Sequence, residues 1–233
     1  MRPFLIALQF LTRCPVRLTG DLEGKDLGRS LLYYPLVGLL MGGLLVACAW
    51  LLRGVAPPLA GALILAWWVI MTGALHLDGL ADTVDAWAGG QGDPARTLAI
   101  MKDPRSGPLG VTALILVLIL KFAGLVAILE AGLGPLLLLP PVLGRIALPL
   151  LFLTTPYVRP GGLGATLARA LPGRAAMGVV LVSYALVALI AGAAGWLALA
   201  ATWLSFISLR QTMVKRIQGT TGDTAGALVE ITE

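Results

Sequence analysis

The sequence predicts an all-α fold, a polytopic membrane helix bundle of about six transmembrane helices, built as a single integral membrane domain over residues 1–233. Hydrophobic residues make up 58% of the chain and charged residues only 12%, which is more apolar surface than a soluble core of this size would bury. Long apolar stretches recur at about the length that a bilayer requires. Lysine and arginine residues gather in alternate connections between these stretches, as expected of a membrane protein.

The first element expected is a short N-terminal helix. An apolar run covers residues 4–11, with Arg2 before it and Arg13 after it. This run is too short to span ~30 Å of hydrocarbon, and the small-residue cleavage pattern of a signal peptide does not follow it. We therefore expect an interfacial or re-entrant helix.

Six longer apolar stretches follow, and each is predicted to cross the membrane. Residues 192–195 separate the last two, where the pattern leaves open either a tight turn or one long tilted helix. The predicted spans are residues 31–52, 58–76, 108–129, 134–153, 176–193 and 195–209.

The distribution of positive charge predicts the orientation of these spans. With six spans, 14 of the 17 Lys and Arg residues fall on one side of the membrane and Arg53 alone on the other. The remaining two, Lys121 and Arg145, lie within spans, where a charge is expected to face the bundle interior or, for Lys121, to reach an interface. Because cytoplasmic loops are the cation-rich ones, both termini are predicted to be cytoplasmic.

A cluster of acids follows the second predicted span. Asp78, Asp82 and Asp85 fall within roughly 60° of one another on a helix, so their carboxylates share one face. Like charges at this spacing repel, and such oxygen ligands suit a hard divalent cation such as Mg²⁺. The alternative is a solvated acidic helix end. His76, one turn earlier, is a candidate base or ligand, or a hydrogen-bonded packing residue.

Two further segments could bind an anion. Lys102 and Arg105 bracket Asp103 just before the third span, whose N-terminal N–H groups could bind phosphate; a surface turn is the alternative. Near the end, Gly and Thr residues surround Asp223 in a pattern typical of an anion-binding nest, an added metal ligand or a disordered tail. Arg145, near mid-span, is a candidate to contact an anionic group or one of the acids.

These parts together indicate phosphoryl transfer at a membrane surface, with Mg²⁺ held by acids and phosphate held by cations. The sequence shows no Ser/His/Asp or Cys/His arrangement for a covalent intermediate. Direct in-line transfer to an acceptor hydroxyl is therefore favoured.

Five motifs occur in a fixed order along the chain: Phe10-Leu11-Thr12-Arg13-Cys14-Pro15, Tyr34-Pro35-Leu36-Val37-Gly38, His76-Leu77-Asp78-Gly79-Leu80-Ala81-Asp82-Thr83-Val84-Asp85, Ile100-Met101-Lys102-Asp103-Pro104-Arg105, and Thr221-Gly222-Asp223 followed by Gly226-Ala227. In these motifs the chain resembles the cobalamin synthase family, the adenosylcobinamide-GDP ribazoletransferases, over nearly its full length. It departs from the usual family pattern at Ala86, Pro104 and Gln218, where the family usually has Gly, Ser and Gly.

The resemblance implies the last assembly step of the cobamide pathway. The ribose 5′ oxygen of α-ribazole, or of its 5′-phosphate, would displace GMP from adenosylcobinamide-GDP and give adenosylcobalamin or its phosphate, with Mg²⁺ required. It implies a metal site of Asp78, Asp82 and Asp85, completed by Asp103 and Asp223. Asp82 is expected to be the essential residue, and either a carboxylate or His76 would remove the hydroxyl proton. The residues implied to hold phosphate are Lys102, Arg105, Arg145 and Gly222.

The same reading implies a location and a set of partners. The protein is expected in the inner membrane of a bacterium or archaeon, with its active site facing the cytoplasm. The lipid bilayer and the two substrates are its expected partners, nucleic acid is not one, and a homo-oligomer stays open.

Two other functions are considered. A CDP-alcohol phosphotransferase also carries an Asp-Gly motif on a helix of a six-span bundle, but it expects Ala-Arg after the first Asp-Gly pair, whereas Ala81 is followed here by Asp82. A divalent-cation transporter would need acids at mid-membrane, and the three acids lie at the predicted cytoplasmic end.

Overall fold

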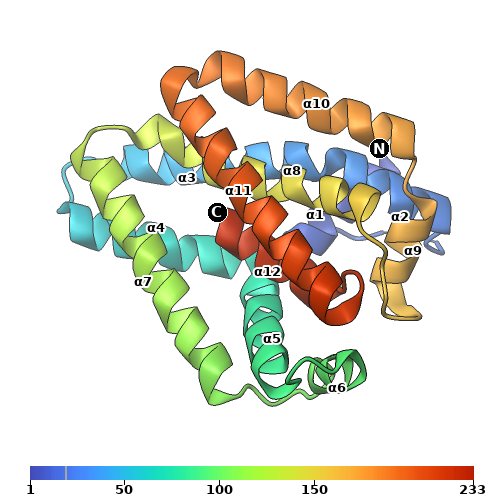
Figure 1. Ribbon diagram of the computed structural model, residues 1–233. Coiled ribbons are helices and arrows are strands. Elements are labelled where there is room, and N and C mark those ends of the chain that lie inside the picture. The colour runs from blue at the N-terminus through green and yellow to red at the C-terminus, as the bar shows by residue number, and fades with distance from the viewer. Residues whose placement is uncertain (19) are drawn as a thin grey trace.

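The computed structural model describes residues 1–18 and 20–233, and within these residues its regular elements are all helices (Figure 1). The regular elements are α1 Arg2–Leu11, α2 Gly24–Ser30, η1 Leu31–Tyr33, α3 Tyr34–Leu51, α4 Pro57–Thr72, α5 Leu75–Gly89, α6 Pro94–Ile100, α7 Pro108–Glu130, η2 Gly134–Leu138, α8 Leu139–Thr154, α9 Gly162–Ala170, α10 Gly173–Ile190, α11 Gly192–Ile217 and α12 Gly222–Thr232.

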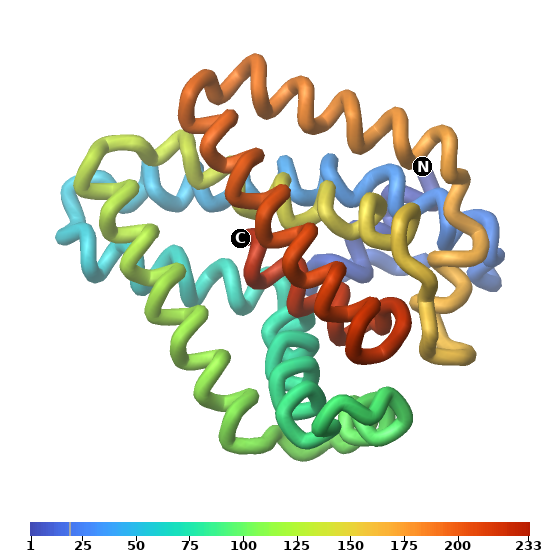
Figure 2. Tube along the Cα trace, in the orientation of Figure 1, coloured from blue at the N-terminus to red at the C-terminus, as the bar shows by residue number. Residues whose placement is uncertain are grey.

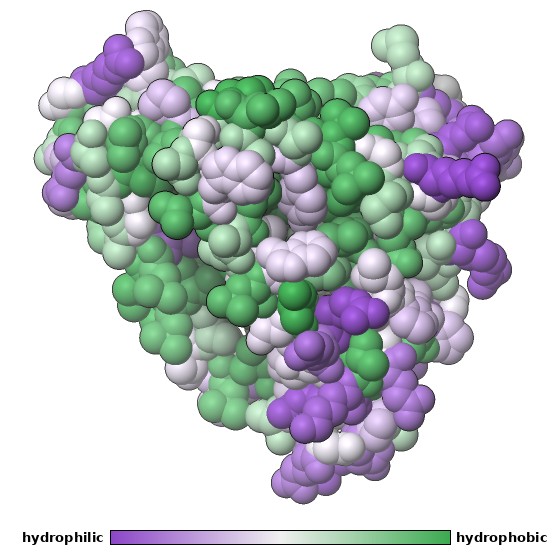
Figure 3. All heavy atoms as spheres, turned by 45° about the horizontal axis from the view of Figure 1, so that its top comes forward, coloured by the Kyte–Doolittle hydropathy of each residue, from purple (hydrophilic) through white to green (hydrophobic). Residues whose placement is uncertain are grey.

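The structure confirms a membrane helix bundle. Five helical segments are long and apolar enough to cross a bilayer, and α4 gives a sixth when it is taken together with α5. The five are Gly24–Leu51, Pro108–Glu130, Gly134–Thr154, Gly173–Ile190 and Gly192–Ile217. Large apolar side chains stand on the outside of these helices; Leu120 of α7 and Leu189 of α10, for example, are 71% and 80% exposed. Apolar residues also cover the middle of the face in Figure 3, which is the surface that lipid would cover.

The second predicted span ends earlier than expected, at a sharp break. Gly73 and Ala74 both adopt left-handed backbone conformations, with φ of +62° and +58°, and α5 leaves the direction of α4 by 86°. Arg13 lies against this break: its amide donates to the carbonyl of Met71 at 2.8 Å, and a Cβ on Gly73 would overlap its side chain. The expectation of one continuous helix over residues 58–76 is therefore wrong. The break turns α5 out of the line of the spans (Figure 1).

The last two spans are separate helices. α10 ends at Ile190, and α11 begins at Gly192, whose φ of +54° reverses the chain. The two helices pack closely, because a Cβ on Gly195 would lie 2.5 Å from the carbonyl oxygen of Val187. The structure thus favours the tight turn over one long helix.

The N-terminal segment forms the short helix that the sequence predicts. α1 has ten residues and buries Ile6, Ala7 and Leu11 against the bundle. It is too short to span a bilayer, and its position at an interface stays a prediction.

The C-terminal segment is a buried helix instead of a disordered tail. α11 ends at Ile217, and the next residue, Gln218, has a left-handed φ of +59°, a conformation that favours glycine at the end of a helix. Thr221 and Thr224 then form a capping box that starts α12. α12 runs back into the bundle, and the C-terminus lies near its centre in the trace of Figure 2.

Four charged side chains meet inside the bundle, and two of them come from the C-terminal end. Lys121 Nζ of α7 lies 2.5 Å from Glu230 Oε2 and 2.7 Å from Glu233 Oε2, and it sits 4.6 Å from the centre of the Trp68 ring. Arg145 of α8 is fully buried and pairs with Glu233. Unpaired charges are costly inside a membrane protein, so this cluster holds α12 between α7 and α8.

Removing Lys121, the central cation of this cluster, should lower the unfolding free energy strongly. Lys121→Met would leave Glu230 and Glu233 with one cation fewer in a buried site, and we expect a loss of about 3 kcal/mol in unfolding free energy. Thermal unfolding in detergent measures it. Arg174→Met removes a cation from an exposed position and should leave the midpoint within about 1 °C of wild type. Equal unfolding midpoints for the two variants would contradict the stabilising role given to the buried cluster.

Candidate active site

The site is built where α5 and α12 touch. A Cβ on Gly79 would lie 2.7 Å from the carbonyl oxygen of Asp223, so only glycine allows this approach of the two helices. Gly226 lies one turn further along α12, where an added Cβ would be 3.4 Å from the backbone of His76. The contact brings Asp223, distant in sequence, beside the acids of α5.

The charges of this cluster act on one another. Burial raises the pKa of Asp82 to about 6, with further contributions from the like charges of Asp78 and Asp223, while Arg159 opposes the rise. Burial also raises the pKa of Asp223, against the opposing effect of Arg159. Both carboxylates lie outside the five segments that could cross a membrane. A cation bound between them would relieve this repulsion.

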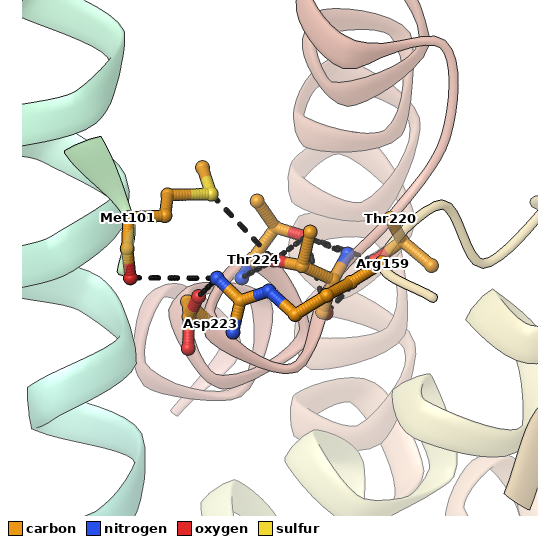
Figure 4. A network of polar contacts seen from close by, with 6 residues as sticks. Met101, Arg159, Thr220, Asp223 and Thr224 are labelled. Atoms are coloured by element: carbon orange, nitrogen blue, oxygen red, sulfur yellow. Dashed lines mark hydrogen bonds and ion pairs between the residues drawn. The ribbon is translucent and has the colours of Figure 1, made fainter. Parts of the chain in front are cut away.

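Arg159 is the cation of the site, and sequence reasoning had assigned it only to membrane orientation. It lies in the loop after α8, and its guanidinium bonds the Asp223 carboxylate at 2.6 Å and approaches the carbonyl of Met101 at 3.4 Å (Figure 4). The loop is fixed to the start of α12 because the amide of Thr220 donates to Pro156, and that of Val158 donates to Thr220. Arg159 is far from Asp223 in the sequence, and tertiary packing brings the two side chains together.

Asp85 has a different role from its two neighbours in this structure. Its carboxylate accepts hydrogen bonds from the amides of Gly107, at 2.6 Å, and Gly110, at 2.8 Å. It thereby caps the N-terminus of α7, where free amides favour an anion. A Cβ on either glycine would overlap the carboxylate. The N–H groups predicted to receive a phosphate are therefore occupied by a side chain of the protein itself.

The loop after α6 forms a local turn. Asp103 pairs with the exposed guanidinium of Arg105 at 2.7 Å and accepts a bond from its backbone amide at 3.1 Å. These hydrogen bonds lower the pKa of Asp103 to about 2. Lys102 is exposed beside them. The structure thus shows the surface turn of the alternative interpretation, and it does not bring Asp103 into the acidic cluster.

The other predicted residues divide into two groups. His76 and Gly222 line a cavity of about 230 Å³ that also borders Asp78 and Asp223. Arg145 is buried against Glu233, so a phosphate would have to displace that carboxylate to reach it.

A larger cavity, of about 730 Å³, lies at the other end of the bundle between α3, α4 and the loop around Gly134. Arg53 is the charged side chain in its lining. It offers no group for acid, base or metal chemistry, so its size does not make it the active site.

The acids of the site have the ligand type that Mg²⁺ prefers, although they do not form a complete set of protein ligands around one position. Within the described residues, no three His, Cys, Asp or Glu side chains stand close enough to hold one ion. Mg²⁺, however, is commonly held by one or two carboxylates together with substrate phosphates and water. Asp78 and Asp82 supply such oxygen ligands.

Fold and site define an integral membrane protein with a carboxylate-rich, arginine-containing site at one end of a helical bundle. The family described as cobalamin-5-phosphate synthase matches residues 3–233. The chain belongs to this family.

Similarity to individual relatives extends over the whole length of this chain. Proteins of Pseudomonas putida and Pseudomonas aeruginosa are each 58% identical to this chain, and one of Stutzerimonas stutzeri is 55% identical. Each match covers 100% of this chain and 95% of the relative, and all three relatives are named adenosylcobinamide-GDP ribazoletransferase. No solved structure matches the chain.

The two neighbouring acids of α5 should respond oppositely to the same substitution. In metal-free buffer, Asp82→Asn removes a partly buried charge that its acidic neighbours repel, so the unfolding temperature should stay or rise. Asp85→Asn weakens two bonds that cap α7 and should cost about 1–2 kcal/mol. Thermal unfolding in EDTA compares the two. A lower midpoint for Asp82→Asn than for Asp85→Asn would refute these roles.

Proposed function

We propose that this protein transfers the adenosylcobinamide phosphoryl moiety from adenosylcobinamide-GDP to α-ribazole or α-ribazole 5′-phosphate, in the final assembly step of cobalamin biosynthesis. The observation that carries the proposal is the full-length family match, with relatives 55–58% identical that are named for this activity. A free ribose hydroxyl oxygen of the acceptor forms the new bond to phosphorus, its proton is removed, and the bond from that phosphorus to the GMP oxygen breaks. This oxygen is not the 5′ oxygen expected from the sequence, because in α-ribazole 5′-phosphate the 5′ oxygen is already bonded to phosphorus. The products are GMP and adenosylcobalamin or its phosphate.

The site offers both kinds of group that this reaction needs. Arg159 is partly exposed beside Asp223 and is placed to bind a phosphate oxygen. Asp78 and Asp82 would hold Mg²⁺ with the substrate phosphates, where the ion supplies positive charge for the diphosphate. Lys102 and Arg105 are exposed and accessible to a second anionic group.

The location of the site follows from the charge pattern. Most Lys and Arg residues fall in the connections at the end of the bundle that carries α5, α6 and the loop of Arg159. Cation-rich connections are cytoplasmic in membrane proteins. The proposed active site therefore faces the cytoplasm, from a cell (inner) membrane.

GMP release tests the proposal. Detergent-purified protein given adenosylcobinamide-GDP, α-ribazole and Mg²⁺ should release GMP and form a cobalamin product, and EDTA should abolish both. Asp82→Asn should lower kcat/KM by about 10²-fold or more, since it removes a charged ligand of the metal. Asp21→Asn, a matched change at an exposed loop position, should retain wild-type activity.

Two results would contradict the proposal. One is a folded protein that releases no GMP with either acceptor. The other is GMP release that proceeds equally in EDTA or in the Asp82→Asn variant, which would remove the metal from the account.

A further inference from the structure

The cavity of about 230 Å³ has two unlike sides. On one side it borders the carboxylates of Asp78 and Asp223. On the other side its walls are apolar and aromatic, with Phe10 of α1 stacked on Tyr34 of α3 and Phe152 of α8 nearby. The apolar side thus lies directly beside the groups that would hold phosphate and metal.

Two polar atoms in the lining of this cavity lack a hydrogen-bond partner, the Tyr34 hydroxyl and His76 Nδ1. His76 lines the cavity, is only 3% exposed, and its Nδ1 makes no hydrogen bond within the described residues. An unpaired buried polar atom costs roughly 1–3 kcal/mol. A ligand with a single complementary atom, placed among aromatic and aliphatic side chains, would satisfy it.

The size of the cavity limits what can enter. Pockets for whole small ligands measure roughly 300–1,000 Å³, so this one suits a fragment such as a single bicyclic ring. A corrinoid macrocycle is far too large. The parts of the two substrates that match this size are their heteroaromatic bases: the guanine and the adenine of the donor, and the base of the acceptor.

We propose that this cavity binds the benzimidazole base of the acceptor nucleoside, with His76 Nδ1 paired to its one free ring nitrogen. This inference rests on the proposed function. Guanine and adenine each carry several polar atoms on their edges, more than the two unpaired atoms of this lining could satisfy. A methylated benzimidazole is apolar apart from that nitrogen, and aromatic side chains stack well on it. Its ribose would then extend toward Asp78 and Asp223, where the attacking ribose hydroxyl must react.

Changing the cavity volume tests the assignment. Leu163 of α9 lines the cavity and is 40% exposed, so Leu163→Trp should narrow the cavity while the protein still folds. Leu148→Ala should enlarge it from the α8 side. Leu181→Trp, on the outer surface of α10 at 61% exposure, is the matched control. Each variant is given α-ribazole and the corresponding riboside without the two methyl groups.

The proposal predicts a change in acceptor preference. Leu163→Trp should raise the Kd and the KM for α-ribazole by about tenfold and should favour the smaller base, because filling a pocket by a few carbon atoms has effects of this size. Leu148→Ala should weaken the discrimination between the two bases. The KM for adenosylcobinamide-GDP should change less than twofold in both variants, and Leu181→Trp should match wild type.

Three results would overturn it: a KM increase for adenosylcobinamide-GDP instead of the acceptor, equal effects on both acceptors, or no effect at all. Equilibrium dialysis with α-ribazole alone needs no turnover, so it separates this inference from the proposed function. Binding that weakens in Leu163→Trp, in a protein that releases no GMP, would keep the cavity assignment and reject the reaction.

Discussion

The buried ion cluster of Lys121, Arg145, Glu230 and Glu233 is the constraint on which the rest of this structure depends. Two cations within apolar spans need partners, because an isolated charge in a membrane bundle is costly. The C-terminal helix supplies both carboxylates, and it can do so only by returning into the bundle. Since Asp223 lies in the first turn of α12, the same return brings that acid to α5.

Local backbone features complete the arrangement. The break at Gly73 and Ala74 turns α5 away from α4, which removes its acids from the line of the membrane spans. Gly79 then allows α12 to approach closely, and the loop that is bonded to Thr220 delivers Arg159. Three distant parts of the chain thus meet at one end of the bundle. Each acid there has different surroundings: Asp223 pairs with Arg159, and Asp85 accepts hydrogen bonds from backbone amides. Asp82 is partly buried beside other acids.

Much of the architecture can be predicted from sequence because lipid imposes simple rules. Spans must be apolar and about 20 residues long, so apolar helices occur in all six predicted regions, five of them long enough to cross a membrane and a sixth when α4 and α5 are taken together. The predicted limits match closely for residues 108–129 and 134–153, and the other spans begin or end several residues away from the predicted positions. The acidic helix is also confirmed, because its spacing is a local property. The division of residues 176–209 into two helices needed the structure, since one glycine conformation at Gly192 decides it.

Pairing between distant residues could not be predicted in this way. Arg159 looked like any other loop cation, and no local pattern links it to Asp223, 64 positions later. Arg145 was expected to meet an anionic group, and the anion in the structure is Glu233 of the chain itself. Asp85 shares a helical face with Asp82, yet the start of α7 takes its carboxylate. Composition and periodicity do not contain this information, because it depends on how helices are packed.

The most direct test of the account is Mn²⁺ binding, measured by electron paramagnetic resonance with GDP as the phosphate-bearing probe. The account predicts that wild-type protein binds Mn²⁺ together with GDP, that Asp82→Asn loses this binding, and that Asp85→Asn retains it because Asp85 caps a helix. Loss of Mn²⁺ in Asp85→Asn but not in Asp82→Asn would contradict the division of roles along α5 from which the proposed site is built.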